Sequence, residues 1–259
     1  GDVYKRQIPL DMPVERLLID IGNTTLGYCH ESDLKQKAHV SLQHGSYEIK
    51  NLLEQVYSKK AFDEILLASV YKPDLKEDIL QWSKAKKLPC QVAASQSKKH
   101  GLVNGYTDFE QLGVDRWLAM LSIWSETRSA FFLISSGTAM TFDMVDDQGA
   151  HQGGIIIPGY EMMQSCLKKG TVGIDNTDQN NRVFWGLAKN TGNALANGSL
   201  MAISSVIDNL IVESGLETRQ GFITGGDAKL INSYRQKPLQ IIENTVLKGL
   251  VRAFEDDAA

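Results

Sequence analysis

One pattern occurs twice in this chain: a short apolar stretch, a polar turn that contains glycine, and a second apolar stretch. Residues 16–30 contain it with Gly22 in the turn, and residues 131–145 contain it with Gly137 in the turn, an offset of 115 residues. Short apolar stretches bounded by such turns are typical of β-strands. An internal duplication is the simplest explanation, and it predicts two similar domains.

Each copy of this pattern is followed by segments with helical spacing that alternate with further apolar stretches. Strands that alternate with helices are typical of α/β folds, in which ligands gather at strand ends and between domains. We therefore expect two similar α/β domains that face a cleft. The expected helices are 47–57, 73–87, 109–126, 158–169 and 188–214, and the further strands are 38–42, 64–70, 152–157 and 221–224.

Composition narrows the classes of protein to which this chain can belong. Of its 259 residues, 42% are hydrophobic and 22% are charged, which is typical of a soluble globular protein. The net charge of −4 gives no electrostatic reason to bind nucleic acid or an anionic membrane. Uninterrupted apolar runs fall far short of the roughly 20 residues that cross a bilayer, so we expect a cytoplasmic protein.

The cysteines and histidines give no sign of a metal site. The three cysteines form no C-x-x-C pair, and the five histidines form no run with zinc-ligand spacing. We expect reduced thiols and histidines that lie in the core or on the surface. Residues 1–13 precede any periodic pattern and are expected to be a disordered or foreign extension, followed by domains at 14–118 and 119–259.

The chain has neither a P-loop nor a dinucleotide-binding fingerprint, so another kind of phosphate-binding turn must be considered. Three glycine-containing turns are the candidates. In the segment from Asp20 to Thr24, a glycine turn exposes backbone N–H groups, and the aspartate can face a magnesium ion. The turn 135–138 repeats this arrangement, and Gly225 and Gly226 follow a strand and precede a helix. Ordinary hairpins and strand-to-helix connections use the same residues, so that alternative stays open for each turn.

An acid and an arginine lie side by side at Asp115 and Arg116, directly after Gly113. If their helix lines a cleft, the carboxylate can hold an attacking hydroxyl and the guanidinium can bind an anionic group. The alternative is an exposed ion pair on a solvated helix turn, which contributes about 0.3–0.5 kcal/mol. The two residues alone do not decide between these interpretations.

Six blocks of the sequence stand out together, at residues 19–24, 112–120, 137–143, 153–159, 224–228 and 247–250. In this order they resemble the blocks of type III pantothenate kinases. The resemblance implies the fold of the acetate and sugar kinase, Hsp70 and actin superfamily, with two actin-like (ribonuclease H-like) α/β domains that face a nucleotide cleft. It also implies the ATP-dependent phosphorylation of pantothenate, the first step of coenzyme A synthesis. The cofactors would be magnesium and a monovalent cation such as potassium or ammonium, and the partner a second copy in a cytoplasmic homodimer.

The same resemblance implies a role for individual residues. Asp115 would be the catalytic base, and Ser135 stands where many members have aspartate. The residues that bind ATP would be Asp20, Gly22, Asn23, Thr24, Gly137 and Thr138, with Gly225 and Gly226 beside the nucleotide. The residues that bind pantothenate would be Tyr106, Gly113, Asp115, Arg116 and Thr191. The metal ligands would be Asp20 for magnesium and Asp143 for the monovalent cation. By the dimer pattern, Thr191 would reach the site of a neighbouring subunit.

Two other functions remain possible at this point. One is a nucleotide-binding regulatory accessory factor of the same fold without kinase activity, and the other is a kinase of a different small alcohol. The presence of Asp20, Asp115 and Arg116 favours the pantothenate kinase.

Overall fold

The computed structural model describes residues 14–36, 39–70, 73–171, 174, 183–216 and 219–257. The extension expected at 1–13 lies outside the described residues. Backbone contacts divide the chain into a first unit that ends at Ala93 and a second that begins at Ala94. The sequence instead places the domain boundary at 118.

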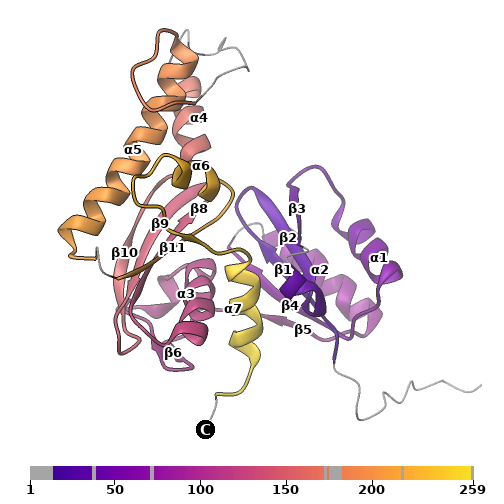
Figure 1. Ribbon diagram of the computed structural model, residues 1–259. Coiled ribbons are helices and arrows are strands. Elements are labelled where there is room, and N and C mark those ends of the chain that lie inside the picture. Colours follow the sequence, from indigo (N-terminus) through magenta and orange to yellow (C-terminus); the bar gives the residue numbers. More distant parts are fainter. Residues whose placement is uncertain are drawn as a thin grey trace, which may run out of the picture. The chain divides into compact units, whose positions relative to one another are not determined.

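The first unit is built on a five-stranded sheet with the order β3-β2-β1-β4-β5 (Figure 1). Strand β1 pairs antiparallel with β2 and parallel with β4. Leu17, Ile19 and Ile21 pack with apolar residues of α1 and α2, while Leu18 is also fully buried. A strand buried on both sides reads as a continuous apolar run, as β1 does. The elements are β1 (Arg16–Ile21), β2 (Thr25–His30), η1 (Glu31–Gln36), β3 (Val40–Gln43), α1 (Ile49–Lys59), β4 (Glu64–Ser69), α2 (Pro73–Lys86) and β5 (Cys90–Val92).

The second unit contains a five-stranded sheet with the order β10-β9-β8-β11-β12. Apolar residues of β8 and β9 pack with α4, α5 and α6 in one core cluster, and α7 packs closely on α3. The elements are β6 (Lys98–Lys99), β7 (Leu102–Val103), η2 (Phe109–Gln111), α3 (Val114–Thr127), β8 (Phe131–Ser136), β9 (Ala139–Val145), β10 (His151–Pro158), α4 (Tyr160–Gly170), α5 (Thr191–Glu213), β11 (Gln220–Thr224), α6 (Ala228–Ser233), β12 (Gln240–Ile241) and α7 (Thr245–Phe254).

The two sheets have equivalent strand orders and pairings. In each, the first strand of the unit's main hairpin is central, pairs antiparallel with the next strand and pairs parallel with a later one. This equivalence confirms the two similar α/β domains expected from the repeat.

The helix expected over 109–126 is interrupted. A short 3-10 turn ends at Gln111, Gly113 caps the next helix, and α3 begins at Val114. Ten residues of α3 are buried, which is typical of a helix packed on several sides. Because α3 packs on α7, near the C-terminus of the chain, it belongs to the second unit. That packing explains why the contacts divide the chain before 118.

Helix α7 was not expected, although one of the six blocks lies in it. A Cβ atom at Gly249 would lie 1.9 Å from the carbonyl oxygen of Leu118, so the glycine allows α7 to approach α3 closely. The short strands β5 and β12 were missed as well, because two or three residues carry too little periodicity to be recognised.

Helix α5 is long and apolar enough, by length and composition, to cross a membrane. Leu200, Ile203 and Ile207 of this helix are fully buried in the core cluster of the second unit. A buried helix that supplies core residues of a globular unit can be as long and apolar as a membrane-spanning helix. The apolar composition of α5 is therefore explained by its packing in the core.

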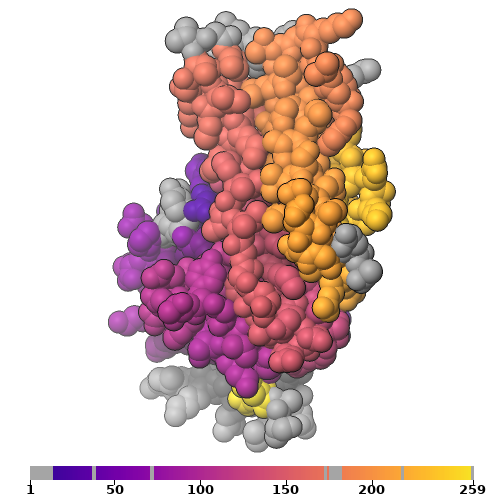
Figure 2. All heavy atoms as spheres, turned by 90° about the vertical axis from the view of Figure 1, so that its left-hand side faces the viewer, coloured from indigo at the N-terminus to yellow at the C-terminus, as the bar shows by residue number. Residues whose placement is uncertain are grey.

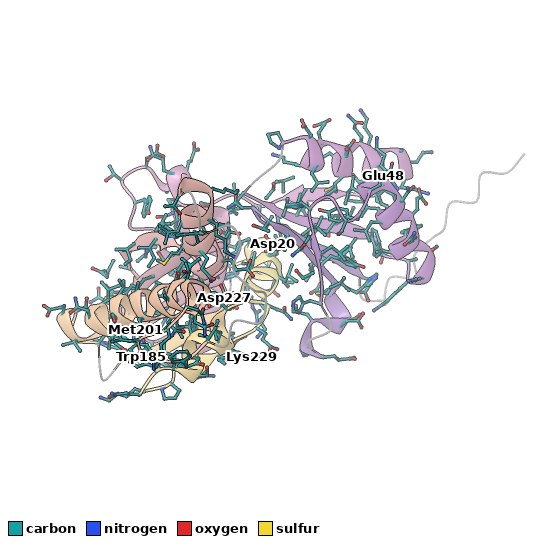
Figure 3. The ribbon with its side chains drawn as sticks, turned by 90° about the horizontal axis from the view of Figure 1, so that it is seen from above. Asp20, Glu48, Trp185, Met201, Asp227 and Lys229 are labelled. Carbon is teal, nitrogen blue, oxygen red and sulfur yellow. The ribbon has the colours of Figure 1, made fainter. Side chains whose placement is uncertain are left out.

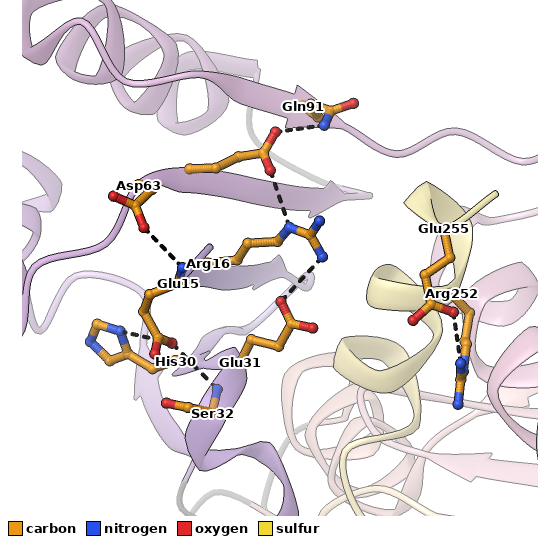
Figure 4. A network of polar contacts seen from close by, with 10 residues as sticks. Glu15, Arg16, His30, Glu31, Ser32, Asp63, Gln91, Arg252 and Glu255 are labelled. Carbon is orange, nitrogen blue, oxygen red and sulfur yellow. Dashed lines mark hydrogen bonds and ion pairs between the residues drawn. The ribbon is translucent and has the colours of Figure 1, made fainter. Parts of the chain in front are cut away.

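Charged side chains connect the strands at the start of β1 (Figure 4). Arg16 donates to Glu64 Oε2 at 3.1 Å and to Glu31 Oε2 at 3.3 Å, and the backbone N–H of Glu15 donates to Asp63 Oδ2 at 2.9 Å. The glycine turn follows the opposite end of β1, after Ile21.

Candidate functional site

The first glycine turn connects β1 to β2 in the first unit. Ile21 pairs with Leu26, and the N–H of Gly22 donates to the carbonyl of Thr25 at 2.9 Å. Asn23 and Thr24 are exposed at the tip of this turn. Backbone donors and small polar side chains in an exposed tight turn are suited to binding phosphate oxygens.

Asp20 lies on the last part of β1, directly before this turn (Figure 3). Its half-buried position places a carboxylate beside the candidate phosphate site. The structure thus brings together Asp20, Gly22, Asn23 and Thr24, which the sequence assigned to one loop.

In the second unit, three glycines meet at one end of the sheet. A Cβ atom at Gly159 would lie 2.0 Å from the carbonyl oxygen of Gly137, and one at Gly225 would lie 2.0 Å from that of Ser136. Gly225 also has a φ of +100°, in the left-handed region that favours glycine. The turns around Gly137 and Gly225 are therefore packed against each other.

The third turn continues directly into α6. Thr224 pairs with Ser135 across parallel strands, and the N–H of Asp227 lies 3.4 Å from the carbonyl oxygen of Ser136. Asp227, at the start of α6, is shown in Figure 3. Burial, followed by the nearby charge of Glu161, raises the pKa of the Asp227 carboxyl. The sequence-predicted residues Gly137, Thr138, Gly225 and Gly226 thus belong to two adjoining turns.

A buried polar network surrounds Arg116 in the same unit. Arg116 donates through Nε to Asp143 Oδ2 at 3.0 Å and through Nη2 to Asp143 Oδ1 at 2.6 Å. Its Nη1 donates to the hydroxyl of Tyr106 at 2.8 Å. His151 Nε2 donates to Asp143 Oδ1 at 3.0 Å, and its ring stacks on that of Tyr106 with centroids 5.9 Å apart. The four side chains therefore form a closed ring of contacts.

Three side chains of this network are almost completely removed from solvent, and Tyr106 is half-buried. Arg116 is 5% exposed, Asp143 1% and His151 3%. Burial alone would lower the pKa of the Arg116 guanidinium, but its bonds to Asp143 raise that pKa above its ordinary value. Burial would likewise raise the pKa of the Asp143 carboxyl, and the bonds from His151 and Arg116 outweigh this effect and lower it. The alternative interpretation from the sequence, an exposed ion pair on a solvated helix turn, is therefore wrong for Arg116.

Two glycines make room for the network. A Cβ atom at Gly154 would lie 2.5 Å from Arg116 Nη2 and 2.6 Å from Asp143 Oδ1. A Cβ atom at Gly105 would lie 1.9 Å from the carbonyl oxygen of His151. These contacts require the absence of a side chain at both positions.

Asp115 precedes Arg116 in the first turn of α3. Its Oδ1 accepts the N–H of Arg116 at 2.9 Å. Burial raises the pKa of the Asp115 carboxyl, and the adjacent Arg116 only partly opposes that effect. A carboxylate with a raised pKa in the first turn of a helix is suited to accepting a proton from a bound hydroxyl.

Thr191 and Asp143 lie in two different elements, α5 and β9. Thr191 is exposed in the first turn of α5, an element apart from the Arg116 network. Both oxygens of Asp143 already accept N–H bonds, so a cation bound there would compete with Arg116. Asp143 is thus the partner of Arg116 in the structure, and its role as a ligand of the monovalent cation stays a prediction.

Sequence reasoning gave no role to His151 and Gly154. The available signal was the pair of consecutive glycines at 153–154, two residues after His151 and directly before an apolar run, because such glycines mark close approach by another group. The sequence could not show that the approaching group is Arg116.

A model of the type III pantothenate kinase family matches residues 16–213 of this chain. The chain belongs to the type III pantothenate kinase family. The match covers both glycine turns of the repeated pattern, the Arg116 network and Thr191.

Individual members of this family are similar over most of their length. A type III pantothenate kinase of Nitrosococcus oceani is 29% identical over 251 residues, which cover 93% of this chain and 94% of the relative. One of Cellvibrio japonicus is 32% identical over 224 residues, covering 83% and 87% of the two chains.

A solved structure of another protein has the same fold as this chain. It is a conserved protein of Campylobacter jejuni assigned to the Baf family of transcriptional activators, with a TM-score of 0.57 and 20% identity over 92% of this chain and 96% of that one. At this identity the likeness concerns the fold alone.

Proposed function

We propose that this chain transfers the γ-phosphoryl group of ATP to the primary hydroxyl of pantothenate, the first step of coenzyme A synthesis. The observation that carries the proposal is the buried Arg116 network next to Asp115, in a chain that belongs to the type III pantothenate kinase family. The network presents a fixed cation and a tyrosine hydroxyl beside a carboxylate with a raised pKa.

In this proposal, Asp115 orients the attacking hydroxyl and accepts its proton. Phosphoryl transfer proceeds through a loose transition state, so positioning and charge stabilisation contribute more than the strength of the base. Arg116 and Tyr106, with Gly113, bind pantothenate, whose carboxylate is a suitable partner for a guanidinium.

The glycine turns are proposed to bind ATP. The turn from Asp20 to Thr24 would hold phosphate oxygens through backbone N–H groups, and Gly137 with Thr138 would do the same in the second unit. Gly225 and Gly226 would lie beside the nucleotide, because the backbone at a glycine has no side chain and a flat group can approach it closely.

Magnesium is the proposed metal, with Asp20 as its protein ligand. Within the described ranges, no group of three or more His, Cys, Asp or Glu side chains could hold a metal ion. A site with one carboxylate fits magnesium, which usually takes its other ligands from substrate phosphates and water. When bound, the ion would neutralise charge on the phosphates. A monovalent cation, potassium or ammonium, is proposed on family membership, with Asp143 as its candidate ligand.

A homodimer in the cytoplasm is proposed as the working form, with Thr191 contributing to the partner's pantothenate site. Large apolar side chains are exposed near α4 and α5, which Figure 2 shows side by side on one face. Leu167 is 48% exposed, Trp185 48% and Leu187 96%. Apolar surface of this kind is typical of association between subunits.

The test is turnover of purified protein with ATP, Mg²⁺ and K⁺, with and without pantothenate. ADP release that depends on pantothenate, with phosphopantothenate found by mass spectrometry, supports the proposal. ATP binding without phosphopantothenate would instead support a regulatory protein, and product from another alcohol would support a different kinase. Light scattering that gives a monomer near 28.7 kDa at micromolar concentration would refute the homodimer.

A further inference from the structure

His44 lies against the first glycine turn and holds it through both backbone and side chain. Its N–H donates to the carbonyl of Thr24 at 3.0 Å, and its Nε2 lies 2.9 Å from the carbonyl oxygen of Gly22. Its Nδ1 lies 2.8 Å from the hydroxyl of Tyr47. Neither His44 nor Tyr47 belongs to the motifs that the family resemblance assigned to the site.

The chemistry of these atoms sets the direction of the hydrogen bonds. A carbonyl oxygen only accepts, so Nε2 of His44 carries the proton that it donates to Gly22. In the neutral ring, Nδ1 is then an acceptor and receives the hydroxyl proton of Tyr47. Tyr47, His44 and Gly22 therefore form a chain of donors that ends on the backbone of the turn.

The bonded carbonyl controls the direction of a neighbouring N–H. The carbonyl of Gly22 and the N–H of Asn23 belong to one planar trans peptide, in which these two bonds point in opposite directions. A bond that fixes the carbonyl toward His44 therefore directs the N–H of Asn23 away from it. That N–H is one of the donors proposed to bind phosphate.

We propose that His44 is a positioning residue for nucleotide phosphate, acting through the Gly22–Asn23 peptide, with Tyr47 fixing its ring. The inference rests on the proposed role of this turn in ATP binding. It predicts that His44 matters for ligands with phosphates and not for the nucleoside. A merely structural role would weaken both kinds of ligand or neither.

The experiment measures dissociation constants of ADP with Mg²⁺ and of adenosine by calorimetry, for the full chain and its variants. His44→Phe keeps a ring but removes the donor, whereas His44→Gln retains an amide that can donate. His39→Gln is the matched control, since His39 is exposed just before β3. Tyr47→Phe removes a single hydroxyl and serves as the milder variant if His44→Phe fails to fold.

We expect His44→Phe to weaken ADP about 5- to 20-fold, the loss of one hydrogen bond that orients a phosphate donor. Adenosine affinity and the KM for pantothenate should change less than about twofold, and Tyr47→Phe should show a smaller loss for ADP alone. His44→Gln should recover part of the ADP affinity.

Unchanged ADP affinity in both His44→Phe and Tyr47→Phe would overturn the role of His44. An equal loss for ADP and adenosine would also overturn it, because the effect would then be on the fold of the unit. If the wild-type chain itself bound adenosine and ADP equally, the phosphate role of the turn would fail first, which distinguishes that failure from one confined to His44.

Discussion

The substitution Asp143→Asn tests the buried network around Arg116. The carboxylate of Asp143 accepts bonds from Nε and Nη2 of Arg116 and from Nε2 of His151. An asparagine has one acceptor oxygen and one NH₂ group, so either orientation of its amide places a donor against a donor of Arg116. The guanidinium, 5% exposed, would also lose its compensating charge.

The expected cost follows from this geometry. Removing one partner of a buried ion pair typically destabilises a protein by about 3–5 kcal/mol, because the other charge remains buried without compensation. We therefore expect Asp143→Asn to lower the free energy of unfolding by about this amount at pH 7. The KM for pantothenate should rise at least about tenfold, equivalent to about 1.4 kcal/mol, since Arg116 loses its fixed position.

Urea unfolding followed by tryptophan fluorescence measures the stability, and Asp147→Asn is the matched control, an exposed aspartate in the turn after β9. The pKa of Asp143 is lowered in the folded chain, so its stabilising effect is fully present above the usual aspartate pKa of about 3.9. The stability difference between wild type and variant should shrink as the pH falls below that value. A variant within about 1 kcal/mol of wild type at pH 7 and with an unchanged KM would refute the reasoning.

Three substitutions in the second unit test the proposed base and the glycines around the site. Asp115→Asn should lower turnover about 10²- to 10⁴-fold in steady-state assays. Because burial raises the pKa of Asp115, its negative charge destabilises the folded chain once the pH has risen through that pKa. The neutral asparagine should therefore cause no loss of stability in urea unfolding at pH 7. Gly225→Ala should cost about 2–4 kcal/mol in the same assay, from its φ of +100° and the contact with Ser136, whereas Gly226→Ala, with open space around it, should cost less than about 1. Gly154→Ala should raise the KM for pantothenate more than that for ATP, since its methyl group would meet the carbonyl of Phe142 and displace both Arg116 and Asp143. An unchanged ratio of the two KM values would contradict this.

Much of the fold could be predicted because its signals are local. The repeated pattern around Gly22 and Gly137 identified two equivalent hairpins, and the sheets that contain them have equivalent strand orders. Apolar runs such as β1 and β4 are buried on both sides, so their sequence marks them without knowledge of their partners. The turn residues were found for the same reason, since a tight turn requires glycine and small polar residues wherever it occurs.

What the sequence could not determine depends on contacts between distant segments. The interruption at Gly113, the place of α3 in the second unit and the presence of α7 follow from helix packing, which overrides the apolar periodicity of 109–126. Two-residue strands such as β12 form only because a neighbouring strand supplies their hydrogen bonds.

The sequence by itself determined the duplicated α/β architecture, the three glycine turns and the adjacent pair at Asp115 and Arg116. Only the tertiary structure decided which groups surround that pair and that Arg116 is buried. Arg116, Asp143 and His151 come from a helix and two strands, and their hydrogen bonds form where these elements pack around Gly154. The contribution of a charged side chain to stability depends on its surroundings. A buried charge without a partner destabilises the fold, whereas a buried charge with a partner is held in one position. Sequence spacing does not contain those surroundings.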